Sequence, residues 1–217
     1  MGVPFVDYDG VQAGDQGKNR KPHDHNRDYS EFIYPETKAL TEWIGEHAQG
    51  RLDAFIDLHC PWIRGDYNEF VYATRKDPKI TPPTAQADRF SEILEKVQSG
   101  ALRYKAANDL PFGKAWNKGV NFAQGWPSVV WACHNVKEPK VCRAMEFPFA
   151  NANGAVVTPE KCRAFGRDIA LALRALLYYT SNRVEFRAHN VADVETVDEK
   201  SGKTIPAAKF PKEMKID

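Results

Sequence analysis

The 217-residue chain lacks the features that mark membrane-spanning, nucleic-acid-binding and secreted precursor proteins. No apolar run approaches the roughly 18 residues that a membrane span requires. Thirty basic and 29 acidic side chains leave a formal net charge of +1, without the basic excess that is typical of nucleic-acid-binding domains. No charged and apolar leader follows the first methionine, so we expect no signal peptide. We therefore expect neither a membrane nor a nucleic acid as a partner.

Cysteine is also scarce, with four residues in the chain and no C-x-x-C pair of the kind that binds zinc. This number is too small for a fold that is built on disulfides. Cys133 and Cys142 flank a polar turn. The two residues could form a single disulfide bridge, or both could be reduced thiols. The redox compartment is therefore undecided.

The pattern of apolar residues indicates an α/β domain, in which strands alternate with helices. Apolar residues recur at helical spacing in three segments: 35–50, 84–99 and 158–179. Three further segments are apolar enough for buried strands: 52–59, 128–133 and 141–147. Three others are expected to be loops or irregular: 7–31, 61–83 and 101–127. Ligands of such sheets bind beyond the carboxyl ends of the strands, so His59 and Glu146 occupy favourable positions.

His59 ends the predicted strand 52–59. Residues two apart in a strand share a face, so Asp57 lies on the same side as His59. A carboxylate in that position orients a histidine that binds a metal ion. The alternative is a histidine that is satisfied within the fold and has no ligand role.

Glu146 lies in the otherwise apolar strand 141–147. Burying a carboxylate is costly unless it has a partner or a chemical role. Burial also raises the pKa of the carboxyl group toward the neutral range that suits a general base. Either Glu146 is such a base, or it pairs with Arg143 or Lys140 at a sheet edge.

Asn26 and Arg27 lie in the polar segment 7–31, which also contains Arg20. A guanidinium group is a planar fork that binds a carboxylate through two parallel hydrogen bonds. Two arginines and an asparagine amide would therefore make an anion-binding pocket. The alternative is a loop that is held together by salt bridges among its own charges.

Three short blocks of sequence resemble the M14 zinc carboxypeptidase family, and they follow the order of that family along the chain. The blocks are Asp24–Tyr29 (DHNRDY), Phe55–His59 (FIDLH) and Arg143–Phe147 (RAMEF). The resemblance covers roughly residues 5–180. It implies a carboxypeptidase-like mixed β-sheet flanked by helices in a partial catalytic domain, residues 1–182. Residues 183–217 would follow as a polar, weakly structured extension with one edge strand. A secreted or periplasmic location is favoured by the resemblance.

The resemblance also implies roles for the residues around a zinc ion. His59 would be a zinc ligand, with Asp57 orienting it. Glu146 would be the general base and acid. Asp24 would support a further histidine ligand.

The substrate would be held by the polar segment. Asn26 and Arg27 match the pair that grips the terminal carboxylate of a peptide. Arg20 matches the arginine that polarises the scissile carbonyl group and stabilises its oxyanion.

The chain departs from the family at its other two zinc ligands, which come from an H-x-x-E motif that this sequence does not contain. We expect the sequence to be truncated at its N-terminus relative to the family. The remaining strands would then have an exposed sheet edge, which a partner chain would cover. His23 and His25 are alternative ligands to complement His59, and Cys60 is a soft donor next to it.

The expected function is that of a zinc-dependent hydrolase that removes C-terminal residues from peptides, with a peptide C-terminus or related carboxylate as substrate. Two other functions stay open. One is a truncated, non-catalytic remnant that binds carboxylates, which the missing H-x-x-E motif favours. The other is an amidase of the same superfamily that acts on cell-wall peptides or acylated amino acids.

Overall fold

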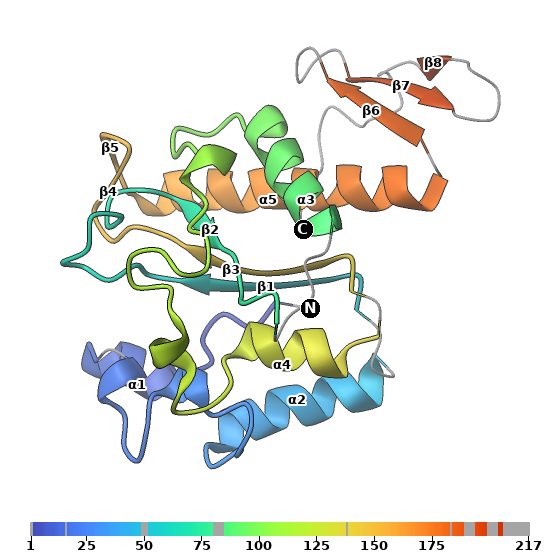
Figure 1. Cartoon of the computed structure of the whole chain (residues 1–217). Coiled ribbons are helices and arrows are strands. Elements are labelled where there is room, and N and C mark those ends of the chain that lie inside the picture. The colour runs from blue at the N-terminus through green and yellow to red at the C-terminus, as the bar shows by residue number, and fades with distance from the viewer. Residues whose placement is uncertain are drawn as a thin grey trace. The chain divides into compact units, whose positions relative to one another are not determined.

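The chain folds as a mixed α/β protein, which confirms the predicted class (Figure 1). The computed structural model describes residues 2–15, 17–48, 52–79, 85–137, 139–182, 184–188, 194–198 and 204–205. It divides into two compact units: Met1–His59, Tyr72–Ala87 and Asp109–Glu146 in the first, and Cys60–Val71, Asp88–Asn108 and Phe147–Asp217 in the second. The predicted boundary after residue 182 falls inside the second unit and stays a prediction. In the described part of the chain, no helix combines the length and the apolar character that a bilayer crossing needs.

A three-stranded sheet in the order β1-β3-β2 forms the centre of the first unit (Figure 1). Its strands are β1 (Ala54–His59), β2 (Tyr72–Thr74) and β3 (Val141–Glu146). β1 and β3 run parallel, in a register that pairs Ala54 with Val141 and His59 with Glu146. β2 runs antiparallel to β3 and pairs Tyr72 with Glu146. The carboxyl ends of the two longer strands therefore meet, with His59 beside Glu146.

β1 is an edge strand among the strands that the structure describes, because it pairs with β3 alone. Leu58 on this strand is 61% exposed. An open strand edge offers unpaired backbone groups to another chain. A partner chain that covers this edge stays a prediction.

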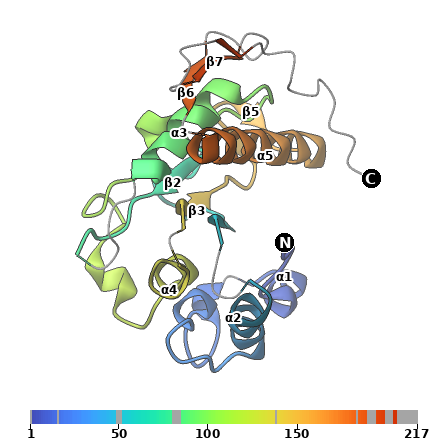
Figure 2. The ribbon, with the colours of Figure 1, turned by 90° about the vertical axis from the view of Figure 1, so that its right-hand side faces the viewer.

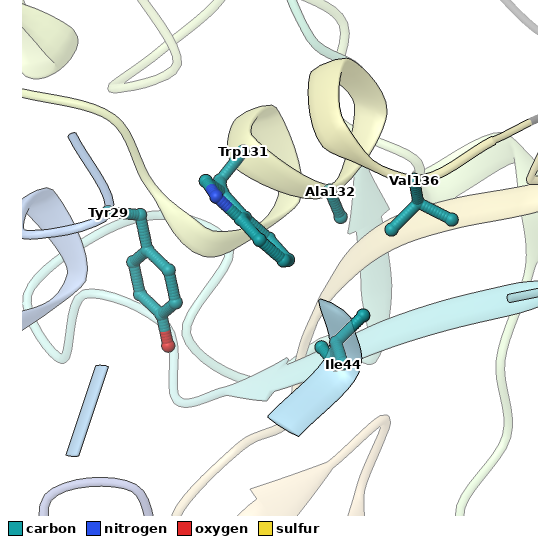
Figure 3. Packing of buried hydrophobic residues seen from close by; sticks show 5 residues of the cluster. All are labelled: Tyr29, Ile44, Trp131, Ala132 and Val136. Carbon is teal, nitrogen blue, oxygen red and sulfur yellow. The ribbon is translucent and has the colours of Figure 1, made fainter. Parts of the chain in front are cut away.

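Two helices lie on one face of this sheet (Figures 1 and 2). α4 (Ser128–Asn135) packs on β1 and β3, and α2 (Pro35–His47) lies beside α4. The helices share a buried cluster, which Figure 3 shows: Tyr29, Ile44, Trp131, Ala132 and Val136. Phe55 of β1 and Cys142 of β3 pack against it. Burying a large apolar side chain contributes about 1.5–3 kcal/mol, so this cluster fixes the helices on the sheet.

The segment 7–31 contains three short helical elements, so its prediction as a loop is wrong. They are α1 (Tyr8–Ala13), η1 (Gly17–Asn19) and η2 (His25–Arg27). The carboxylate of Asp7 accepts a hydrogen bond from the Gly10 nitrogen at 3.0 Å and begins α1. Gly14 ends it with a φ of 68°, a conformation that glycine adopts without strain. These two caps stabilise a helical turn in a segment whose composition resembles a loop.

Asp28 joins this segment to α2 and is fully buried. Its carboxylate accepts hydrogen bonds from the backbone nitrogens of Ile33 and Tyr34, each at 2.9 Å, and from the Thr37 hydroxyl. His23 Nε2 lies 2.9 Å from the same carboxylate. Burial by itself would raise the pKa of Asp28, but these hydrogen bonds outweigh it and lower the pKa below its ordinary value. A single carboxylate thus fixes the entry of the chain into α2.

The second unit is organised around α5 (Pro159–Asn182). The Asp168 carboxylate accepts hydrogen bonds from the backbone nitrogens of Ser99 and Gly100, both at 3.0 Å, just after the end of α3. Its remaining elements are α3 (Ala85–Val97), η3 (Ala106–Asn108), β4 (Asn151–Ala152), β5 (Ala155–Val156), β6 (Val184–Ala188), β7 (Val194–Asp198) and β8 (Thr204–Ile205). β4 and β5 form a hairpin, and β6, β7 and β8 form an antiparallel sheet.

The three predicted helices and two of the three predicted strands are confirmed as α2, α3, α5, β1 and β3. Residue 50, where the first helix was expected to stop, lies outside the described residues. The Thr158 hydroxyl accepts a hydrogen bond from the Lys161 nitrogen at 3.3 Å, as expected of the residue that caps α5.

The strand predicted over 128–133 is wrong, because these residues belong to α4. A short continuous apolar run fits a buried helix as well as a buried strand. Here Val129 to Ala132 are buried on successive positions, against the sheet and against α2. The segments 61–83 and 183–217 were also expected to hold less structure than they do. β2 lies in the first, and three strands rather than one lie in the second.

We predict that Asp28→Asn lowers the free energy of unfolding at pH 7 by about 1–3 kcal/mol, because an amide leaves at least one buried donor unsatisfied. The folded-state pKa of Asp28 is lowered, so its contribution is present above the unfolded-state pKa of about 4 and is lost as the pH falls below it. Urea unfolding of both proteins at pH 7 and pH 3 measures this. The exposed Asp53→Asn, which breaks an ion pair with Lys140, is the control and should change little. An equal stability difference at both pH values would contradict the prediction.

Candidate active site

Glu146 is the last residue of β3, and its side chain is buried, with 6% exposed. Its Oε2 atom is buried and has no hydrogen-bond partner among the described residues. Burial raises the pKa of Glu146 to about 7, although the positive charges of His59 and Lys76 act in the opposite direction. A carboxyl group with this pKa is present in both protonation states near neutral pH, which suits a general base or acid.

His59 lies next to Glu146 in the register of the sheet and is held by two side chains. Its Nε2 atom is 2.8 Å from Oδ2 of Asp57 and 2.7 Å from Nδ2 of Asn26. The first residue of α4, Ser128, fixes both partners. Its hydroxyl donates to Asp57, and its backbone nitrogen donates to Oδ1 of Asn26 at 3.0 Å. The amide oxygen of Asn26 is therefore committed to α4, and its NH2 group faces the imidazole.

His59 carries a positive charge near neutral pH. Burial alone would lower its pKa, but the carboxylates of Asp57 and Glu146 raise the pKa to about 9. The pKa of Asp57 is correspondingly lowered: burial opposes this, and the charge and hydrogen bonds of His59 and Ser128 outweigh burial. Nε2 donates its proton to Asp57, whereas a hydrogen bond from Asn26 would need its lone pair. Only one of these two hydrogen bonds is thus made at a time.

Arg27 lies at the end of η2, half-buried, and its guanidinium group is fixed by two carbonyl oxygens. Nε donates to the Asn121 oxygen at 2.5 Å, and Nη1 donates to the Asn26 oxygen at 2.6 Å. The guanidinium carbon is 5.4 Å from the centre of the Phe122 ring. Asn121 and Phe122 belong to η4 (Gly119–Phe122). Nη2 takes part in neither of these two hydrogen bonds.

Lys76, which follows β2, completes the charged cluster and has no role in the sequence prediction. Its ammonium group is 5.6 Å from the centre of the same Phe122 ring. Burial lowers its pKa to about 8, while the carboxylates of Asp57 and Glu146 oppose that shift. Lys76 belongs to no sequence motif and lies in a segment expected to be irregular. The sequence therefore carries no signal for Lys76, and none for Ser128 or Asn121.

Arg20 and Asp24 make their contacts elsewhere. The guanidinium group of Arg20 binds both carboxylate oxygens of Asp7, with Nε at 3.0 and 3.2 Å, and this pairing raises its pKa. The Asp24 carboxylate accepts a hydrogen bond from the Asn26 nitrogen at 2.9 Å and caps η2. The structure thus brings His59, Asp57, Asn26 and Glu146 together, and Arg27 binds the backbone oxygen of Asn26. The roles expected of Arg20 and Asp24 stay predictions.

The donor atoms near His59 do not fit a zinc ion by themselves. A catalytic zinc site needs three protein ligands, and its imidazoles bind in the neutral form. In the described ranges, no group of three His, Cys, Asp or Glu side chains is placed to hold a metal ion. Of the alternative ligands, His23 contacts Asp28, and the ring of His25 stacks on Tyr34 with 4.6 Å between their centres.

The four cysteines, including the exposed Cys60, are free thiols. Cys133 of α4 and Cys142 of β3 form a hydrogen-bonded thiol pair rather than a bridge.

No family model, no curated protein and no solved structure matches this chain. What the site does is therefore inferred from its geometry and from the resemblance of its sequence blocks.

We predict that Asn26→Leu lowers the free energy of unfolding by about 1–2 kcal/mol, because it removes the acceptor that satisfies the first backbone donor of α4. Asn26→Asp keeps an acceptor for Ser128 and places a carboxylate next to the cationic His59. It should therefore retain most of the stability. Urea unfolding of the three proteins under the same conditions measures both effects. Equal stability of the Asn26→Leu variant and the unchanged protein would show that this contact does not hold α4.

Proposed function

We propose that this chain is the carboxylate-binding and general-base part of a metallocarboxypeptidase-like hydrolase, which removes C-terminal residues from peptides. The observation that carries the proposal is the convergence of His59 and Glu146 at the shared end of β1 and β3, with Asn26 in contact with the imidazole. The three residues come from the three sequence blocks that resemble the M14 family. The parallel pairing of β1 with β3 and the contact between Asn26 and His59 bring residues of all three blocks to one end of the sheet.

Glu146 supplies the acid–base chemistry in this proposal. It takes a proton from the attacking water and returns a proton to the leaving amine. Its burial and its pKa of about 7 suit it to both steps. The unpartnered Oε2 atom is the position from which it would reach the water.

Arg27 is the residue that grips the terminal carboxylate. Its guanidinium group is held in place before the substrate arrives, so little side-chain freedom is lost on binding. Asn26 has a different task from the one expected, because its amide already contacts Ser128 and His59. It positions Arg27 through its backbone oxygen and binds the first backbone nitrogen of α4 through its side-chain oxygen.

Zinc enters the proposal through the family resemblance, which assigns one ligand to His59. The metal would polarise the scissile carbonyl group and lower the pKa of a bound water. The other ligands would have to come from residues outside the described set. No step above depends on the metal.

The second candidate is a non-catalytic protein that binds carboxylates. The specific observation in its favour is the ion pair between protonated His59 and Asp57. This ion pair stabilises the protonated imidazole, whereas a zinc ligand must be neutral. The two candidates share the Arg27 grip and differ in zinc binding and turnover.

We predict that the chain binds N-acetyl-phenylalanine, and that Arg27→Gln weakens this binding at least about tenfold through the loss of a charge-assisted hydrogen bond. N-acetyl-phenylalanine amide, which lacks the carboxylate, should not bind. Arg20→Gln is the matched control, because the guanidinium group of Arg20 is occupied by Asp7. Isothermal titration calorimetry of the three proteins with each of the two ligands measures these affinities. Equal affinity of the acid and the amide would refute the carboxylate grip.

We further predict that Glu146→Gln lowers the rate at which the chain hydrolyses an N-acylated dipeptide by about 10²–10⁴-fold. The variant should bind N-acetyl-phenylalanine like the unchanged protein, because the amide keeps the size of the carboxyl group. Rates are followed by the released amino acid and zinc binding by calorimetry. Carboxylate binding without zinc binding or turnover would assign the chain to the second candidate.

A further inference from the structure

Cys133 and Cys142 form a pair of thiols that the proposed function does not use. Cys142 is the second residue of β3, and the register of the sheet aligns it with Phe55 of β1. Both of these side chains pack against the buried cluster that holds α4 and α2 on the sheet. The side chain of Cys142 therefore points from the sheet toward α4, which packs on β3 (Figure 1).

Cys133 lies on the part of α4 that this side chain faces. It follows Ala132 and lies three residues before Val136, and both of these residues belong to the same cluster. Residues three apart on a helix are neighbours on its surface, so Cys133 lies beside the cluster against which Cys142 packs. A hydrogen bond joins the two thiol groups. Both cysteines are half-buried free thiols, so a small reagent has access to the pair.

We infer that Cys133 and Cys142 form a site of reversible oxidation, at which a hydroperoxide such as hydrogen peroxide converts the two thiols into a disulfide that ties α4 to β3. Ser128 at the start of α4 binds Asp57 and Asn26, so the bridge would fix the helix that arranges the candidate active site. Neither cysteine has a role in the proposed hydrolysis. The test of this site is therefore independent of whether the chain is a hydrolase.

The two thiols differ in how readily they ionise, and this difference assigns their roles. The hydrogen bond with Cys142 lowers the pKa of Cys133; burial opposes this shift, and the positive charge of Lys76 adds to it. The same hydrogen bond, together with burial, raises the pKa of Cys142. The thiolate is the form that attacks a peroxide. Cys133 is therefore the nucleophile, and Cys142 is the protonated thiol that completes the bridge.

Atoms and electrons balance in two steps. The Cys133 thiolate attacks one oxygen of hydrogen peroxide, the O–O bond breaks, hydroxide leaves, and Cys133 becomes a sulfenic acid. The Cys142 sulfur then attacks the Cys133 sulfur, and the oxygen of the sulfenic acid leaves as water with the Cys142 proton. The hydroxide takes up the proton that Cys133 released on ionisation. The two sulfurs together lose two electrons, which the peroxide oxygens gain, and the products are one disulfide and two waters.

The bridge can be detected directly, because trypsin cleaves after Lys137 and Lys140, which lie between the two cysteines. The whole chain is treated with hydrogen peroxide, its remaining thiols are alkylated, and the unreduced digest is analysed by mass spectrometry. We expect peptide 119–137 joined to peptide 141–143 with the loss of two hydrogens, and dithiothreitol should separate them. The variant Cys60→Ser should give the same yield of this link, which shows that the exposed Cys60 takes no part in it.

Two serine variants test the roles of the thiols, because serine keeps a hydroxyl group that donates a hydrogen bond. In Cys142→Ser, peroxide should leave a sulfenic acid on Cys133, which dimedone traps. This adduct should be at least about tenfold more abundant than the adduct on Cys142 in Cys133→Ser, since each pKa unit changes the thiolate fraction about tenfold. If a serine variant does not fold, as judged by circular dichroism, the alanine variant replaces it.

The outcomes that overturn the inference are distinct from those that test hydrolysis. Absence of the link between 119–137 and 141–143 in the unchanged chain, or its replacement by links to Cys60 or Cys162, would refute the site. Equal dimedone labelling of Cys133 and Cys142 in the two variants would refute their assigned roles. Neither result bears on the binding of N-acetyl-phenylalanine or on turnover.

Discussion

The parallel pairing of β1 with β3 is the interaction on which the site depends. Its register aligns His59 with Glu146 and Leu58 with Met145. Because side chains alternate along a strand, Leu58 and Met145 point to the opposite face of the sheet from His59 and Glu146. A shift of one residue would turn Glu146 away from His59 and place Met145 there. The register is held by α4, whose apolar residues pack on both strands and whose first residue binds Asp57 and Asn26. The same helix therefore stabilises the sheet and arranges the site.

The electrostatics of the site follow from this arrangement. Glu146 is buried, whereas Asp57, His59 and Lys76 are half-buried, and the charges of these four groups shift one another's pKa values. Asp57 and His59 satisfy one another. Glu146 and Lys76 do not fully do so, since burial moves the pKa of each toward its neutral form. Glu146 and Lys76 are therefore the two groups of the cluster whose charges the described residues compensate least completely.

Much of the fold could be predicted because the signals are local. The caps and apolar stripes of α2 and α5, and the apolar runs of β1 and β3, act within a few residues of the chain. α4 could not be distinguished from a strand, because its apolar residues face both the sheet and α2 and leave no polar stripe. β2 is three residues long, and its pairing with β3 depends on a distant segment. Local sequence patterns do not specify such pairings.

The site divides in the same way. His59, Glu146 and Arg27 could be predicted because each stands out from its neighbours: a polar residue at a strand end, an acid in an apolar strand, and an arginine beside an asparagine. Lys76, Ser128 and Asn121 do not stand out, since lysine, serine and asparagine are ordinary in loops and at helix starts. Their importance comes from three-dimensional contacts alone.

The two basic residues Arg20 and Lys76 show most clearly that contacts decide the role of a residue. Arg20 and Lys76 look alike in sequence, but Asp7 binds Arg20, whereas Lys76 lies over the Phe122 ring and its charge lowers the pKa of the buried Glu146. Which cation serves a site is decided by which carboxylates have already found partners.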